Sequence, residues 1–132
     1  MKIASWFPKR CWTPSNAMDQ YMVSTEKGKC KVNTQCMKFD RNTRLKTAVE
    51  CIKITEIIQE NKQLLKMDFI VVHGLEDKVT DPKLSQNLYN DRKDECDATI
   101  KLYDKSYHML WWEPCRDEMY SDLLFWLNEK SQ

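Results

Sequence analysis

Residues 69–82 read FIVVHGLEDKVTDP, and this stretch decides the fold class that the sequence predicts. Its start is almost continuously apolar and rich in β-branched residues, as in a strand that is covered on both faces inside a parallel sheet. Gly74, one of only 2 glycines in the chain, ends the run, and acidic and polar residues follow at once. A helix is expected from Pro82, because Asp81 can cap it and proline suits a first helical turn.

Apolar residues recur at three- and four-residue steps after Thr43, and charged residues occupy the other side. This pattern predicts an amphipathic helix of about five turns. Its apolar positions are Leu45, Val49, Ile52, Ile54, Ile57 and Ile58. Residues 1 to about 40 show no dominant period, and short helices separated by turns fit them.

A second strand and a last helix complete the pattern. Ile100 and Leu102 alternate with other residues between positions 99 and 103, which favours a strand. Near the end of the chain, one side of a helix is formed by Met119, Leu123, Leu124 and Leu127. The order strand, helix, strand, helix predicts an α/β fold with a parallel sheet and right-handed crossovers. Two strands alone make a marginal sheet, so we expect a flanking part of the sheet to lie outside this sequence.

The composition excludes several classes of protein. Lys and Arg total 21 against 20 for Asp and Glu, so the net charge of +1 gives no reason to expect a nucleic-acid partner. No apolar run is long enough to span a membrane, and the first residues, MKIASWFPKRCW, lack the apolar stretch of a signal peptide. We therefore expect a cytoplasmic protein.

The 6 cysteines are interpreted as free thiols, because nothing in the sequence indicates an oxidising compartment. No two of them have the spacing of a zinc knuckle. We expect no metal and no cofactor. An alternative metal site would use His73, Asp77 and His108, but no supporting motif accompanies these residues.

Two titratable residues follow the two predicted strands at the same short distance. Asp77 comes after the first strand and His108 after the second, and the carboxyl ends of adjacent parallel strands meet at one edge of a sheet. A carboxylate that accepts a hydrogen bond from one imidazole nitrogen leaves the other nitrogen free to take a proton from a nucleophile. We therefore predict that Gly74 lets the chain turn so that Asp77 faces His108. A structural turn is the alternative for Asp77, and His73 is interpreted as a packed, hydrogen-bonded residue.

Several segments together resemble one family of enzymes. HGLEDKVTDP resembles the H-G-x-x-D-x-V-T-D-P segment of monoacylglycerol lipase-like and lysophospholipase-like serine hydrolases, which are also called the serine aminopeptidase S33 family and have the α/β-hydrolase fold. TRLKTAVECIK, KLYDKSYHMLWWEP and LLFWLNEK are similar to the helix that leads back from the cap, the strand and loop of the histidine, and the terminal helix. WFPKRCWTPS is similar to part of the cap, so the resemblance follows nearly the whole chain in order.

The resemblance implies the C-terminal part of an α/β-hydrolase fold. Residues 46–132 would supply its last two parallel strands with their helices, and residues 1–45 would form part of the helical cap or lid. Asp77 would be the acid of the catalytic triad and His108 its general base. The implied substrate is a carboxylic ester, expected to be a monoacylglycerol or a lysophospholipid, with peripheral membrane contact through the cap.

The nucleophile of this family is absent from the sequence. Its serine stands in G-x-S-x-G on a strand-to-helix turn, whereas the glycines here are at positions 28 and 74 only. We therefore expect the C-terminal piece of a serine hydrolase that is inactive on esters by itself, because a triad acts as a unit. A cysteine nucleophile at Cys11, Cys30, Cys36 or Cys51 would keep the chain order, but none has an elbow sequence. The alternative function is a short pseudoenzyme that binds an acyl ligand or a full-length relative.

Overall fold

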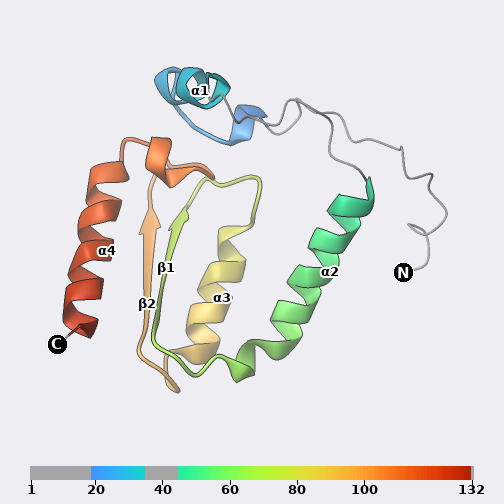
Figure 1. The fold of residues 1–132 in the computed structure, drawn as a ribbon, viewed down its shortest axis with the longest axis vertical. Helices are drawn as coiled ribbons and strands as arrows, with labels where there is room; N and C mark the ends of the chain where they lie inside the picture. The colour runs from blue at the N-terminus through green and yellow to red at the C-terminus, as the bar shows by residue number, and fades with distance from the viewer. Residues whose placement is uncertain (1–18, 35–44, 132) are drawn as a thin grey trace.

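The computed structural model describes residues 19–34 and 45–131, which form helices around two strands (Figure 1). In chain order the elements are η2 (Asp19–Tyr21), α1 (Glu26–Asn33), α2 (Leu45–Asn61), η3 (Lys62–Leu64), β1 (Phe69–Gly74), α3 (Pro82–Arg92), β2 (Ala98–Tyr103), η4 (Leu110–Trp112) and α4 (Arg116–Lys130). Cys11 and Cys36 lie outside the described residues, and Cys30, Cys51, Cys96 and Cys115 are free thiols.

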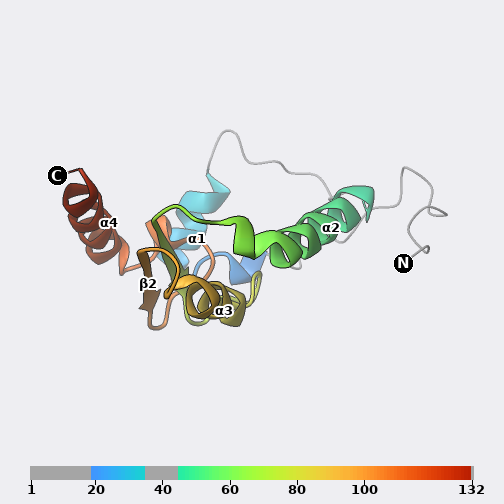
Figure 2. The same cartoon turned by 90° about the horizontal axis from the view of Figure 1, so that it is seen from below.

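The strands β1 and β2 form a two-stranded parallel sheet in the described part of the chain. Phe69 lies opposite Ala98, and the pairing continues in register to Gly74 opposite Tyr103. The helices α3 and α4 lie on opposite sides of the strands, and α2 extends away from the sheet beyond α3 (Figures 1 and 2). The predicted α/β class with a parallel sheet is confirmed.

Side-chain caps mark the starts of α3 and α1, and the predicted helix start at Pro82 is confirmed. The helix α3 begins at Pro82, and the Asp81 carboxylate accepts a hydrogen bond of 2.9 Å from the backbone N–H of Lys83. The shorter helix α1 is capped by Thr25, whose hydroxyl oxygen accepts from the N–H of Gly28 at 3.1 Å. None of the helices in residues 19–34 and 45–131 is long and apolar enough to cross a membrane.

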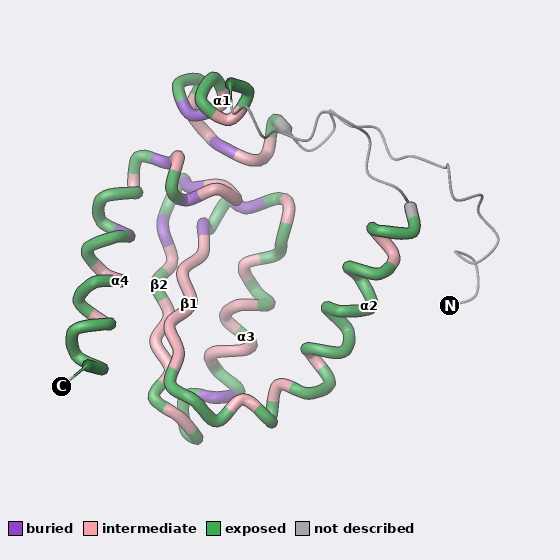
Figure 3. The backbone as a smooth tube through the Cα atoms, viewed as in Figure 1, coloured by how far each residue is buried: buried purple, intermediate pink, exposed green. Residues whose placement is uncertain are grey.

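A small core lies beneath the carboxyl ends of the strands. Tyr103, Leu110 and Met119 form its buried cluster, against which Val72, Cys115 and Leu123 pack. Figure 3 shows that buried residues gather where the strands end and in the loops above them. The part of the molecule that holds Asp77 and His108 is therefore better packed than the lower ends of the strands.

The apolar faces of several elements are less covered than their patterns predict. Along β1 only Gly74 is buried, whereas Phe69 to His73 are partly exposed, so the described elements do not cover both faces of this strand. The isoleucines at positions 52, 54, 57 and 58 of α2 are 49–56% exposed. On α4, Leu124 and Leu127 are also exposed. The helices form as predicted, but no described element covers these faces.

Gly74 is needed for space rather than for a special backbone angle. No glycine of the described chain has a positive φ. The prediction that Gly74 serves to turn the chain toward Asp77 is therefore corrected. A Cβ atom at position 74 would lie 2.3 Å from the carbonyl oxygen of Ser106 and 2.5 Å from that of Tyr107. The missing side chain therefore lets the backbone that leads into His108 approach the end of β1.

We predict that Gly74→Ala lowers the free energy of unfolding by about 1–3 kcal/mol, because backbone atoms cannot yield to the added methyl group as a flexible side chain would. Urea denaturation measures this change. Asn87→Ala, at an exposed position of α3, is the control and should stay within about 0.5 kcal/mol of the parent. Equal stability of the parent and Gly74→Ala would contradict the close approach.

Candidate active site

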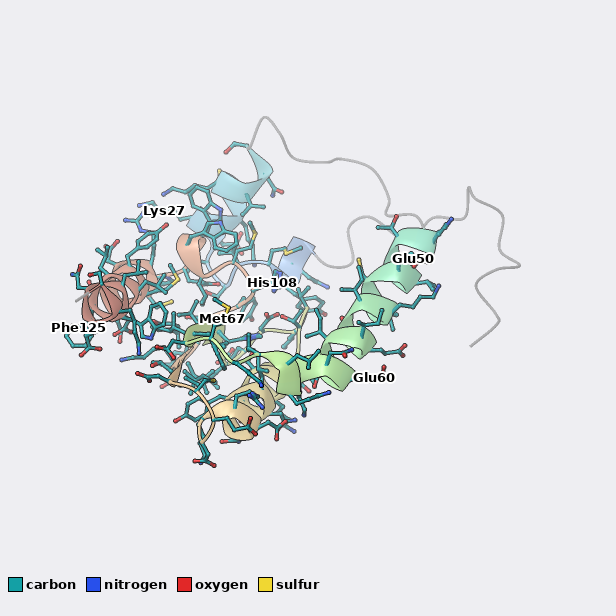
Figure 4. The ribbon with its side chains drawn as sticks, turned by 60° about the horizontal axis from the view of Figure 1, so that its bottom comes forward. Lys27, Glu50, Glu60, Met67, His108 and Phe125 are labelled. Atoms are coloured by element: carbon teal, nitrogen blue, oxygen red, sulfur yellow. The ribbon has the colours of Figure 1, made fainter. Side chains whose placement is uncertain are left out.

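The loops that follow β1 and β2 are joined by their backbones. The N–H of Leu75 donates to the carbonyl of Tyr103 at 3.0 Å, and the N–H of Glu76 donates to the carbonyl of Ser106 at 3.1 Å. Within the second loop, Lys105 adopts a φ of 53°, a left-handed conformation that is uncommon outside glycine. The loop therefore turns tightly after β2, and the carbonyls of Ser106 and Tyr107 come to lie against Gly74 at the end of β1. His108, the next residue, is labelled near the centre of Figure 4.

Asp77 and His108 are in direct contact. The distance between Asp77 Oδ2 and His108 Nδ1 is 2.8 Å. The side chain of Asp77 is only 2% exposed, whereas that of His108 is 34% exposed. The predicted contact is confirmed, and it joins a buried carboxylate to an imidazole that can still be reached from outside.

The Asp77 carboxylate accepts five hydrogen bonds. Its Oδ1 accepts from the backbone N–H groups of Val79 and Thr80, at 2.7 and 3.1 Å. Its Oδ2 accepts from the Thr80 hydroxyl at 2.7 Å, from His108 and, at 3.0 Å, from Nε2 of His73. These donors come from the end of β1, from the turn after Asp77 and from the loop after β2, so one carboxylate connects three segments.

These hydrogen bonds keep Asp77 ionised. Burial by itself raises the pKa of Asp77, but hydrogen bonds from His108, Thr80 and Val79 outweigh it and lower the pKa to about 2. An ionised carboxylate only accepts hydrogen bonds, so the ring nitrogen that faces it must carry a proton. In its neutral form His108 is therefore protonated at Nδ1, which leaves Nε2 unprotonated and able to accept a proton.

His73 has both ring nitrogens occupied. Nε2 faces Asp77, and Nδ1 lies 2.7 Å from the hydroxyl oxygen of Ser85 in α3. The prediction of a packed, hydrogen-bonded histidine is confirmed, and this histidine has no free nitrogen to act as a base. Its contact with Asp77 and the contribution of Thr80 were missed by sequence reasoning, although both residues belong to the segment HGLEDKVT.

The alternative chemistries find less support in this geometry. Nδ1 of His108 and Nε2 of His73 both donate to Asp77, so these atoms offer a metal ion no lone pair. Across the described ranges, no group of three or more His, Cys, Asp or Glu side chains is placed to hold a metal ion. Cys30 on α1 and Cys51 on α2 are exposed and not hydrogen-bonded to His108.

The loop after His108 also borders a groove of about 340 Å³ between α1 and the start of α4. Trp111 and Trp112 line it together with Thr25 and Gly28. Neither Asp77 nor His108 lines this groove.

Protonation of Asp77 is predicted to weaken the folded state. Because its pKa falls from 3.8 to about 2 on folding, the stabilisation is fully present above about pH 5 and is lost as the pH falls through about 2. It contributes on the order of 2 kcal/mol at neutral pH. Urea denaturation as a function of pH should show this loss in the parent but not in Asp77→Asn. Asp94→Asn, at an exposed position, should show the same dependence of the unfolding free energy on pH as the parent. If the parent and Asp77→Asn showed the same pH dependence, the prediction would be refuted.

Comparison with known proteins places this geometry in a family. A model of the family described as serine aminopeptidase, S33, matches residues 1–115. An uncharacterized abhydrolase domain-containing protein of Dictyostelium discoideum is 30% identical over 125 residues, which cover 90% of this chain and 13% of that protein. A caffeoylshikimate esterase of Arabidopsis thaliana is 29% identical over 96 residues, which cover 70% of this chain and 29% of the esterase.

The chain spans less than a third of the length of these two relatives. Its two parallel strands and their helices are consistent with the C-terminal part of an α/β-hydrolase fold. Because the family match extends over most of the sequence, the chain belongs to the serine aminopeptidase S33 family of α/β hydrolases.

Proposed function

We propose that Asp77 and His108 are the acid and the general base of a serine ester hydrolase, of which this chain is the C-terminal part. The observation that carries the proposal is the 2.8 Å contact between a buried, ionised carboxylate and a partly exposed imidazole. Both residues follow the carboxyl ends of adjacent parallel strands, where α/β proteins place their catalytic groups.

In this proposal His108 moves the protons and Asp77 holds it in the correct tautomer. Nε2 of His108 takes the proton of a serine hydroxyl as the oxygen attacks the ester carbonyl, and the imidazolium is stabilised by Asp77. The imidazolium then gives the proton to the leaving alcohol, and water releases the acyl group in a second round. No G-x-S-x-G occurs in the sequence, so the serine is proposed to be encoded outside these 132 residues.

The proposed substrate is a carboxylic ester. The name of the Arabidopsis relative describes an esterase, which supports ester hydrolysis as the reaction. We propose a monoacylglycerol or a lysophospholipid as the ester, because of the resemblance carried by HGLEDKVTDP and KLYDKSYHMLWWEP. Residues 1–45 would then be part of a cap that contacts membrane lipid from the cytoplasm, and residues 46–132 would be part of the hydrolase core.

A second candidate function is non-catalytic binding of a full-length relative. It is favoured by the exposed isoleucines of α2 and the exposed Leu124 and Leu127 of α4, because apolar faces of this kind mark surfaces that another protein covers. In this case the chain would associate with a hydrolase and contribute no catalytic group. The two candidates differ in whether substitution of His108 changes activity.

The 132-residue chain alone is predicted to leave p-nitrophenyl butyrate unhydrolysed. The longer product of the same gene, if it carries G-x-S-x-G, should hydrolyse this ester, and His108→Gln should lower its kcat by at least about 10³-fold. Asn128→Ala, at an exposed position of α4, should leave kcat unchanged.

Two results would contradict the proposal. Hydrolysis by the 132-residue chain that disappears in His108→Gln would place the nucleophile within this sequence. Full activity of His108→Gln in the longer, serine-containing product would remove His108 from the reaction and favour the binding function.

A further inference from the structure

A second buried carboxylate, that of Glu113, lies next to the loop of His108. Glu113 is only 4% exposed. Its Oε1 accepts hydrogen bonds from the backbone N–H of Tyr107 at 3.1 Å and from the backbone N–H of Ser24 at 2.6 Å. Its Oε2 accepts a hydrogen bond from the Ser24 hydroxyl. One side chain therefore binds the residue before His108 and a segment more than eighty positions earlier in the sequence.

The same two segments meet at further points. The N–H of Met109, directly after His108, donates to the carbonyl of Met22 at 2.9 Å. A Cβ atom at Gly28 would lie 2.9 Å from the carbonyl oxygen of Trp112 and 2.3 Å from Cγ1 of the fully buried Val23. Residues 22–28 are therefore in close contact with the loop on both sides of His108.

The hydrogen bonds of Glu113 explain why a charged residue occupies a buried position. No ion pair to Glu113 occurs in the described part of the chain, so backbone amides and a hydroxyl supply its hydrogen bonds. An apolar residue here would leave the N–H groups of Ser24 and Tyr107 without this acceptor. Buried donors that lack a hydrogen bond lower the stability of the fold. The two oxygens of one carboxylate satisfy both segments at once.

We propose that Glu113 is a positioning residue that couples residues 22–28 to His108. When these residues are docked, the backbone on both sides of His108 is fixed, and its Nδ1 stays against Asp77. When they are displaced, Met109 loses its acceptor, Glu113 loses the two donors of Ser24, and the imidazole loses its fixed direction. This inference rests on the proposed roles of Asp77 and His108. In it, the docking of residues 22–28 controls the orientation of the His108 imidazole.

The experiment uses the complete 132-residue chain with ¹⁵N-labelled histidine, at a pH where imidazoles are neutral. The chain has only 2 histidines, so His73→Gln assigns both sets of ring signals. The ring ¹⁵N shifts report the fraction of His108 protonated at Nδ1, and backbone hydrogen exchange reports the docking of residues 22–28. The variants are Glu113→Ala, Glu113→Gln and Ser24→Ala.

In Glu113→Ala we expect exchange at the amides of Ser24, Tyr107 and Met109 to rise at least about tenfold, and His108 to shift from the Nδ1–H form to a mixture of tautomers. Glu113→Gln should keep the parent signals. Its amide oxygen can accept from both N–H groups, and its NH₂ group can donate to the Ser24 hydroxyl. Ser24→Ala should raise exchange in residues 22–28 and at Met109 by a smaller factor and shift His108 in the same direction.

A parent-like tautomer of His108 in Glu113→Ala, with faster exchange in residues 22–28, would overturn the coupling. If Glu113→Ala also loses protection in β1 and β2, Ser24→Ala decides: faster exchange without any change at His108 overturns the proposal. Asp77→Asn tests the underlying function separately. If Asp77→Asn leaves the tautomer of His108 unchanged, the proposed acid and base pair itself is wrong.

Discussion

The arrangement of the site depends on the need to satisfy one buried negative charge. Asp77 is ionised and almost inaccessible to water, so its oxygens require donors from the protein. His73 supplies one from the end of β1, Val79 and Thr80 supply three from the following turn, and His108 supplies one from the loop after β2. Without the charge of Asp77, these three segments would no longer be held together by the need to donate hydrogen bonds to it. The same carboxylate therefore stabilises the local fold and orients His108.

Each of the two glycines of the chain lies against the backbone of the loop that carries His108. Gly74, at the end of β1, makes room for the carbonyls of Ser106 and Tyr107, and Gly28, in α1, makes room for the carbonyl of Trp112. Both positions are places where two backbones approach closely, a use of glycine that depends on its missing side chain and not on its backbone freedom. The histidine proposed as general base must keep its direction, and close backbone contact on two sides of its loop provides this without a large core.

Sequence reasoning predicted features that depend on neighbouring residues and on the geometry of parallel strands. It could not predict contacts between residues that are far apart in the sequence. The strand at residues 69–74, the cap at Asp81 and the contact between Asp77 and His108 follow from local patterns and from the geometry of parallel strands. The role of Gly74 was misassigned because the atoms it accommodates are about thirty residues away in the sequence. Glu113 was part of a matched segment, yet its partner Ser24 is 89 positions distant, and no local pattern signals such a pair.

The exposed face of α2 connects folding to the proposed catalysis. Its isoleucines are about half exposed in the described structure, and covering the exposed part of each would contribute on the order of 1 kcal/mol. In the proposed hydrolase, the polypeptide that supplies the serine would also cover this face. The contact that brings the serine hydroxyl to Nε2 of His108 would then also bury apolar surface. The free energy gained by burying the isoleucines of α2 and the proton transfer at His108 would therefore depend on the same assembly. Residues 19–34 and 45–131 alone neither cover this face nor supply the serine.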